Sequence, residues 1–186
     1  MKKKVIQPTP YGAVVLIWSM AADSPRLRHV LLPEPCKTAP DRAAELYPDA
    51  GSASCPLIDE IASSIHVMLA GEPAAFDPEV VDWSLCTAFE QAVLRAEHAI
   101  PRGQVSTYQL IAARLGNKNS ARAVGNALAK NPFPLIIPCH RAIRSDRRPG
   151  GFRGGAQMKR ALLAAEGIAF DAGGRAIVES FYYAEA

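Results

Sequence analysis

The sequence predicts an α/β fold, in which a small N-terminal α/β domain with a short antiparallel sheet precedes a mainly helical, winged helix-turn-helix-like domain. Two apolar runs, Ala13 to Trp18 and Leu27 to Leu32, flank a turn around Asp23-Ser24-Pro25 and indicate a β-hairpin. Further along the chain, two short helical patterns joined by a turn containing Gly116 indicate a helix-turn-helix.

The first domain is expected to span residues 1–80. After the hairpin, a short helix is predicted near Pro40 to Leu46, and apolar residues at helical spacing predict a longer helix from about Leu57 to Leu69. Gly71-Glu72-Pro73 is expected to end that helix. The stretch from Pro73 to Trp83 is predicted to be a linker, which places the domain boundary near residue 80.

The second domain, residues 81–186, is expected to begin with a helix. Ser84 or Thr87 opens this helix, because a hydroxyl at the N-cap accepts a hydrogen bond from a free backbone N–H. Ser106 or Thr107 caps the next helix in the same way, and a third helix begins at Ser120. The last two helices form the predicted helix-turn-helix.

Length and composition are compatible with one or two small hydrophobic cores. The 186 residues are 49% hydrophobic and carry a net charge of +3, which permits nucleic acid as a partner without requiring it. Four cysteines stand far apart with no C-x-x-C pair, so we expect no zinc ribbon, no disulfide scaffold and a reduced, cytoplasmic protein. A zinc site made by His29, Cys36, Cys55 and His66 is an alternative that their spacing does not support.

The N-terminus has some features of a secretory signal peptide. Lys2-Lys3-Lys4 precede the apolar run that starts at Ala13, but Gln7-Pro8-Thr9-Pro10 interrupts the pattern. The apolar run is better explained as a strand of the hairpin. Because no stretch approaches the length of a membrane span, we expect no membrane partner.

The segment Pro138-Cys139-His140-Arg141 carries the most chemistry in this chain. A thiolate is a strong nucleophile, but a free thiol with a pKa of about 8.5 is only a few per cent ionised at neutral pH, so it needs help from a base. In an extended segment, Cys139 and His140 point to opposite faces, which calls for a bridging water or a third residue. Taken alone, the pair also fits a buried, inert cysteine.

Several strings surround this segment in a fixed order. They are Ile100 to Tyr108, Ala121 to Ala127, Asn131 to Pro134, Gly150 to Gly155, Lys159, and Leu162 to Gly167. In this order and spacing, the strings resemble the O6-alkylguanine-DNA alkyltransferases, also called methylated-DNA-protein-cysteine methyltransferases. The resemblance covers about Ala88 to Gly167.

The resemblance implies DNA repair by direct damage reversal. The resemblance implies that Cys139 takes the alkyl group from O6-alkylguanine in double-stranded DNA, irreversibly and once per molecule, with O4-alkylthymine as a second substrate left open. It implies that His140 deprotonates the thiol through a water, that Glu166 orients and charges the imidazole, and that Tyr108 lies near the base and helps to rotate the nucleotide. It implies no cofactor and no metal, and we expect a monomer.

The resemblance also implies a DNA-binding helix at Ala121 to Ala129 that lies in the minor groove. Arg122 matches the arginine finger that fills the gap left by the flipped nucleotide, because a stacked base keeps its O6 group out of reach of a thiolate. Small residues let a backbone approach a groove only about 6 Å wide. The predicted DNA-binding residues besides Arg122 are Thr107, Ala121, Ala123, Gly125 and Ala127.

A third set of residues is implied to shape the pocket. Asn131 matches a hinge asparagine, Arg141 is expected to be structural, and the backbone around Arg153 is expected to meet the guanine edge. Phe152 stands where the family usually has tyrosine, and the loop Arg144 to Pro149 is unusually basic, so both bear on substrate range. The remaining pocket positions are Pro134, Pro138 and Gly154.

Two other functions compete with this interpretation. Alkyltransferase-like proteins bind lesions without repairing them, but they replace the reactive cysteine, commonly by tryptophan, whereas Cys139 is intact. A cysteine hydrolase of unrelated fold would turn over small esters or peptides without DNA. Arg122 and the helix-turn-helix would then have no purpose.

Overall fold

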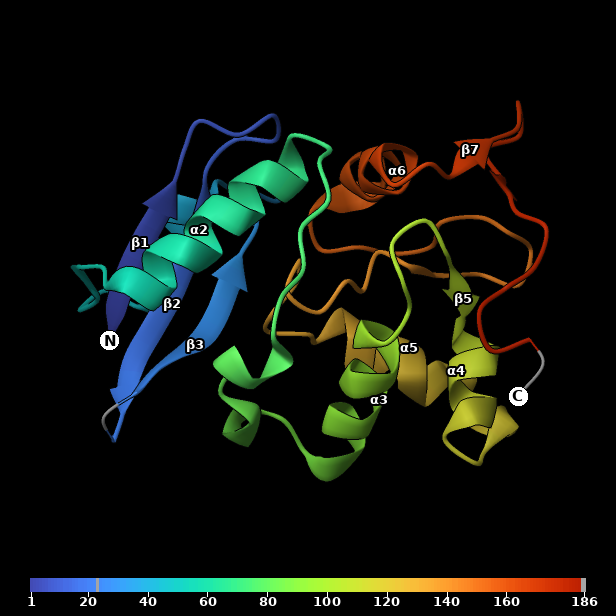
Figure 1. Cartoon of the computed structure of the whole chain (residues 1–186), viewed down its shortest axis with the longest axis horizontal. Helices are drawn as coiled ribbons and strands as arrows, with labels where there is room; N and C mark the ends of the chain where they lie inside the picture. The colour runs from blue at the N-terminus through green and yellow to red at the C-terminus, as the bar shows by residue number, and fades with distance from the viewer. Residues whose placement is uncertain (23, 185–186) are drawn as a thin grey trace. The chain divides into compact units, whose positions relative to one another are not determined.

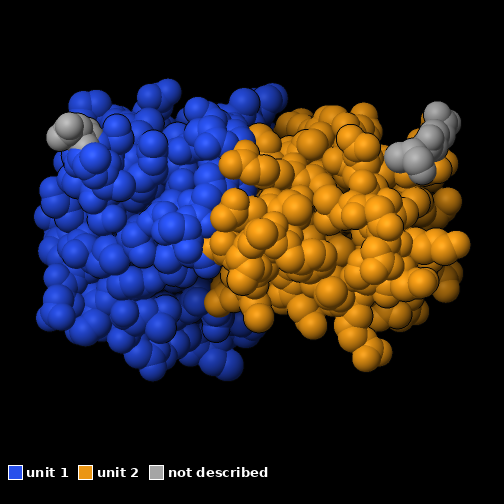
Figure 2. Space-filling view, turned by 90° about the horizontal axis from the view of Figure 1, so that it is seen from below, with its two compact units in different colours: residues 1–85, 132–136 blue, residues 86–131, 137–186 orange. Residues whose placement is uncertain are grey.

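The structure of the chain is a computed structural model that describes residues 1–22 and 24–184. These residues form two compact units, shown in different colours in Figure 2. Unit 1 contains residues 1–85 and 132–136, and unit 2 contains residues 86–131 and 137–186. The chain therefore returns to unit 1 for one short segment directly before the Cys139 region. Asp23, in the predicted hairpin turn, lies outside the described residues.

Unit 1 is built on a four-stranded sheet with the strand order β3-β2-β1-β4. The predicted hairpin is confirmed, because β2 (Val14–Ala21) pairs antiparallel with β3 (Ser24–Leu31). Strand β1 (Lys2–Ile6) adds to β2 in antiparallel fashion, and the short β4 (Gly51–Ser52) runs parallel to β1. Sequence reasoning had not assigned a strand to the lysine run. Lys4 forms an ion pair with Asp59, at 2.8 Å, and the Lys2 ammonium lies 4.8 Å from the centre of the Trp18 ring.

Two α-helices complete unit 1, and the longer of them, α2, is in view in Figure 1. Helix α1 (Ala39–Leu46) starts where Thr38 accepts a hydrogen bond from the Asp41 amide, and α2 (Pro56–Leu69) packs against β1. Both predicted helices are therefore present, each one residue longer at its start. Helix α1 packs on the face of the sheet that carries Val15, Ile17 and Leu31. The intervening residues Leu16 and Trp18 are also buried, so both faces of β2 are covered.

The predicted linker is held against the sheet of unit 1. It contains the short 3-10 helix η1 (Pro78–Val80), and a second 3-10 helix, η2 (Trp83–Leu85), begins at its last residue. Between them, the Asp82 carboxylate pairs with Arg28 on β3, and the Asp82 amide donates to the Leu27 carbonyl at 2.8 Å. The returning segment 132–136 is tied to the same strand, since the Val30 amide donates to the Pro132 carbonyl at 2.8 Å.

Unit 2 contains the predicted helices. Helix α3 (Ala88–His98) begins with a capping box made by Thr87 and Glu90, so of the two predicted N-caps Thr87 is the one used. Thr107 caps α4 (Tyr108–Arg114) by accepting from the Leu110 amide. Helix α5 (Ala121–Ala129) follows the 3-10 turn η3 (Lys118–Ser120), and its predicted cap, Ser120, makes no capping hydrogen bond.

Helices α4 and α5 pack on each other, and α3 packs on both, which confirms the predicted helical domain. Gly116 ends α4 with a φ of +86°, a left-handed conformation that suits glycine and turns the chain toward α5. Figure 1 shows these three helices together.

The rest of unit 2 holds the Cys139 loop in place. Strand β5 (Ser106–Thr107) pairs in parallel with β6 (Ala142–Ile143), so the start of α4 lies beside the residues that follow the loop. Helix α6 (Gly155–Ala165) and the pair β7 (Ala169–Phe170) and β8 (Ala176–Ile177) close the unit. Their core is formed by Val105, Ile143, Leu163, Ile168 and Ala176. Within the described residues, no helix is both long and apolar enough to cross a bilayer.

Candidate active site

Cys139 lies in a tight turn. Its amide donates to the Ile137 carbonyl at 2.8 Å, and the Arg141 amide donates to the Pro138 carbonyl at 2.8 Å. The expectation of an extended segment was therefore wrong, because these two bonds bend the chain at Cys139 and His140. Cys139 and Pro138 are both buried, the cysteine with 9% of its surface exposed.

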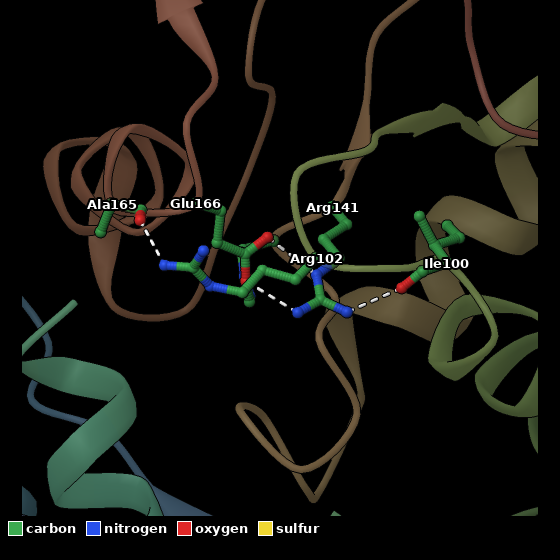
Figure 3. Close-up of polar contacts among 6 residues, drawn as sticks. Ile100, Arg102, Arg141, Ala165 and Glu166 are labelled. Atoms are coloured by element: carbon green, nitrogen blue, oxygen red, sulfur yellow. Dashed lines mark hydrogen bonds and ion pairs between the residues drawn. The ribbon is translucent and has the colours of Figure 1, made fainter. Parts of the chain in front are cut away.

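A buried polar network surrounds His140. Its Nε2 lies 2.9 Å from Glu166 Oε1, and the Arg141 guanidinium donates to both oxygens of the same carboxylate at 2.8 and 2.9 Å. Arg141 also donates to the Ile100 carbonyl at 2.7 Å, and Figure 3 shows its guanidinium between these two acceptors. Nearby, Arg102 donates to the Ala165 carbonyl at 2.6 Å, at the end of α6. Arg141 thus joins the Glu166 carboxylate to the Ile100 carbonyl, and its structural role stays a prediction.

The charges of this network follow from burial and hydrogen bonding. Burial raises the pKa of the Glu166 carboxyl, but the hydrogen bonds from His140 and Arg141 overcome that effect and lower its pKa to about 2. Burial lowers the pKa of His140, and the Glu166 carboxylate only partly opposes this shift. The structure therefore favours a neutral imidazole beside an ionised carboxylate at neutral pH.

The tautomer of His140 follows from its partners. A carboxylate accepts hydrogen bonds, so the proton of the neutral ring belongs on Nε2. That leaves Nδ1 with a free lone pair. Nδ1 is buried and has no hydrogen-bond partner among the described residues. His140 thus presents an unoccupied proton acceptor, directly next to Cys139 in the chain.

Burial favours the protonated form of the Cys139 thiol. Burial raises its pKa to about 11, a hydrogen bond from Asn131 opposes the shift, and the charges of Glu97 and Lys159 act in opposite directions. Asn131 also donates from Nδ2 to the Ile137 carbonyl at 3.1 Å, which joins the end of α5 to the Cys139 turn. A base or a change in local charge is therefore needed to form the thiolate.

Tyr108 stands at the start of α4, half-buried. Burial raises the pKa of its phenol to about 12, so the hydroxyl stays protonated and can donate a hydrogen bond. Gly150 lies against it with a φ of +76°, and a Cβ at that position would be 2.9 Å from the Tyr108 hydroxyl. Glycine is therefore required at residue 150 for both its conformation and its size.

Most of the other predicted pocket residues belong to unit 2. The Phe152 ring meets the His140 ring edge to face, with their centres 6.3 Å apart, and Arg153 donates to the Ala129 carbonyl at 2.9 Å. A Cβ at Gly154 would collide with the Met158 sulfur. Pro134 is buried and belongs to unit 1, in the returning segment.

The predicted DNA-binding residues divide into exposed and buried side chains. Arg122 and Ala123 are exposed on α5, and Ala121 and Gly125 are partly exposed beside them. Ala127 and Thr107 are each only 4% exposed, so these two side chains face the interior of the protein. Thr107 is used as the N-cap of α4.

Glu97 is the residue that sequence reasoning missed. It lies on α3, is fully buried, and contributes to the electrostatics of Cys139 and Tyr108. One signal was available in the sequence, since Glu97 follows Val93 and Leu94 at helical spacing and so falls on the apolar face.

The zinc alternative finds no support, because no three His, Cys, Asp or Glu side chains of the described residues gather into a metal-binding group.

Comparisons with known proteins agree with this geometry. A family model described as the DNA-binding domain of 6-O-methylguanine DNA methyltransferase matches residues 88–168. A methylated-DNA-protein-cysteine methyltransferase of Methanothermobacter thermautotrophicus is 44% identical over 114 residues, which are 61% of this chain and 64% of that protein. A protein of the same name from Methanosarcina acetivorans is 34% identical over 120 residues, which are 64% of this chain and 76% of its own length.

The chain belongs to the methylated-DNA-protein-cysteine methyltransferase family. It covers less than two thirds of the Methanothermobacter relative. A solved structure of the Mycobacterium tuberculosis OGT in complex with DNA resembles it with a TM-score of 0.68 and 29% identity, covering 89% of this chain and 92% of that one. Family membership argues against a cysteine hydrolase of unrelated fold.

Proposed function

We propose that this protein repairs alkylated double-stranded DNA by moving the alkyl group from O6 of guanine to Cys139, once per molecule. The observation that carries the proposal is the buried His140, whose Nε2 is engaged by Glu166 while its Nδ1 is left without a partner among the described residues. A neutral imidazole held in this way is a general base for a neighbouring thiol.

The chemistry is a displacement at the alkyl carbon. His140 Nδ1 takes the thiol proton, through a bridging water, and the Cys139 sulfur forms a bond with the alkyl carbon. The bond from that carbon to O6 breaks, its electron pair stays on the guanine, and the ring nitrogen of the base takes a proton from water. This proton replaces, in the overall balance, the one that the thiol gave to His140. Tyr108 donates a hydrogen bond to the leaving base. The product is a stable thioether, so Cys139 is not regenerated.

The exposed side of α5 is the surface we assign to DNA. Ala121, Ala123 and Gly125 are small enough to let that helix approach a narrow groove, and the exposed Arg122 takes the place of the flipped nucleotide. The loop with Arg144, Arg147 and Arg148 adds positive charge for phosphates, although Asp146 pairs with Arg144 at 3.1 Å. We place the reaction in the cytoplasm, where the four free cysteines of this chain stay reduced.

The deciding experiment is mass analysis of the intact protein and its peptides after mixing with duplex DNA that carries O6-methylguanine. We expect one added methyl group, confined to the peptide with Cys139 and absent with undamaged DNA. The control variant Cys139→Ser is expected to bind the lesion DNA without accepting methyl. Tight lesion binding with no adduct on the wild-type protein would instead support a lesion-binding protein that does not repair.

A further inference from the structure

Unit 2 contains a second buried pair of ionisable side chains that the proposed mechanism does not use. Glu97 on α3 and Lys159 on α6 are both fully buried. Lys159 donates from Nζ to the carbonyls of Ala142, at 2.6 Å, and Gly151, at 3.2 Å. The backbone of Ala142 also lies near enough to the Glu97 carboxyl group to lower its pKa, although the two do not form a full hydrogen bond. Helices α3 and α6 thus bring an acidic and a basic side chain to the same residue, Ala142, three positions after Cys139.

Glu97 is poorly satisfied for a buried carboxyl group. Neither of its oxygens makes a hydrogen bond of acceptable geometry within the described chain. Isolated buried carboxylates are costly, so a group in this setting is kept only partly ionised. Lys159 is a buried positive charge without a close negative partner. Its ammonium donates to two carbonyls and lies 6.0 Å from the centre of the Tyr108 ring, but it forms no close ion pair among the described residues.

Each of these two groups acts on the reactive thiol. The positive charge of Lys159 lowers the pKa of Cys139, and the negative charge of Glu97 raises it. The two side chains therefore have opposite effects on the ionisation of Cys139. The net charge of the pair depends on how many protons the pair holds. With Glu97 protonated the pair carries one positive charge, which favours the thiolate. With Glu97 ionised that advantage is lost.

We propose that Glu97 is a positioning residue for the alkyl-transfer reaction, and that its carboxyl group must be protonated for Lys159 to stabilise the Cys139 thiolate. The proposal rests on the alkyl-transfer function proposed above. It explains why an acid whose oxygens have no hydrogen-bond partner among the described residues is kept in the interior, within electrostatic range of Cys139, where a leucine-like side chain would pack at lower cost.

The charged and titratable groups that face Glu97 come from every element around it. They are Lys159 on α6, Arg141 in the Cys139 turn, Tyr108 on α4, Cys139 itself, and Tyr183 near the C-terminus. Burial raises the pKa of Glu97 to about 8 and lowers that of Lys159 to about 8. Both groups are thus protonated at neutral pH, and the pair loses its favourable charge as the pH rises through this value.

The test is the pH dependence of Cys139 reactivity in Glu97→Gln, measured with iodoacetamide. Glutamine keeps the shape of the side chain and cannot ionise. The alkylation rate of the Cys139 peptide is followed by mass analysis between pH 6.5 and pH 9.5, so that the other three cysteines do not interfere. We expect the ratio of the variant rate to the wild-type rate to be at or below one at pH 6.5. It should rise to about tenfold at the alkaline end, since one pKa unit of the thiol is a factor of ten in thiolate.

Two further variants sharpen the result. Glu90→Gln removes a carboxylate from the same helix near its partly exposed start, and its rate ratio is expected to stay constant with pH. Lys159→Met should react about tenfold more slowly at pH 7 and approach the wild type above pH 9, where the wild-type lysine is uncharged. A pH-independent ratio for Glu97→Gln would overturn the proposal, and so would a Lys159→Met protein that reacts normally at pH 7.

The same variants are then tested for methyl transfer from O6-methylguanine duplexes. The two proposals fail in different ways. If the iodoacetamide ratio rises with pH but no methyl group is transferred from DNA, the role of Glu97 stands and the repair function falls. If methyl is transferred and the ratio of the Glu97→Gln rate to the wild-type rate does not change with pH in either assay, the repair function stands and the role of Glu97 falls.

Discussion

Replacing Glu166 by glutamine tests the buried network around His140 most directly. In the folded protein the carboxylate receives hydrogen bonds from His140 and from Arg141, at 2.8 to 2.9 Å, and its pKa falls from 4.5 to about 2. Each pKa unit corresponds to about 1.4 kcal/mol, so ionisation of Glu166 stabilises the fold by about 3 kcal/mol at neutral pH. Glu166→Gln should lose at least that much, because Arg141 also loses its counter-charge.

The dependence on pH has a definite sign. A carboxyl group with a lowered pKa contributes its full stability above the ordinary value of 4.5, and this contribution disappears as the pH falls toward 2. Urea unfolding of both proteins should therefore give a difference of about 3 kcal/mol at pH 7 and about half of that at pH 3. An equal difference at both pH values would refute the assignment of that stability to an ionised Glu166.

A matched control separates this effect from simple loss of charge. Glu179 lies in the same unit and is exposed, so Glu179→Gln should change stability by less than about 0.5 kcal/mol at either pH. Glu166→Gln should also slow alkyl transfer, since glutamine can accept from Nε2 of His140 but carries no charge to support an imidazolium.

Three further changes test other parts of the protein. Gly150→Ala should destabilise the protein by about 1–3 kcal/mol in urea unfolding and slow methyl transfer, because φ is +76° there and the new Cβ would meet the Tyr108 hydroxyl; wild-type stability would show that this contact relaxes freely. Arg122→Ala should weaken transfer from a duplex more than from the free alkylated base, and equal losses on both would argue against the finger role. Thr87→Ala should cost about 1 kcal/mol through loss of the capping box with Glu90, and an unchanged urea midpoint would contradict it.

The helices were predictable where residues close in the sequence mark their ends. The sequence narrowed two N-caps to pairs of residues that include the ones used, Thr87 and Thr107, and apolar residues at helical spacing mark α2. Strand β1 was not predictable in this way, because three consecutive lysines hide the alternation of a strand. Its place is set by pairing with β2, which is a tertiary contact.

In the candidate site too, some features could be predicted from the sequence and others depend on tertiary contacts. Cys139, His140 and Glu166 could be chosen from the sequence because their strings resemble a known family, and the structure brings His140 and Glu166 into contact at 2.9 Å. The tight turn at Cys139 depends on two backbone hydrogen bonds that the motif does not predict. Glu97 was missed because its meeting with Lys159 requires α3 and α6 to converge on Ala142.

The returning segment 132–136 limits how this protein can be divided. Phe133, Leu135 and Ile136 are each at most 1% exposed, and the Pro132 carbonyl accepts from the Val30 amide of β3. A fragment beginning at residue 86 would keep this segment and lose the strand that receives it, leaving three large apolar side chains uncovered a few residues before the nucleophile. Truncation at the apparent boundary is therefore expected to give an aggregation-prone product, and biochemical work on Cys139 calls for the full chain.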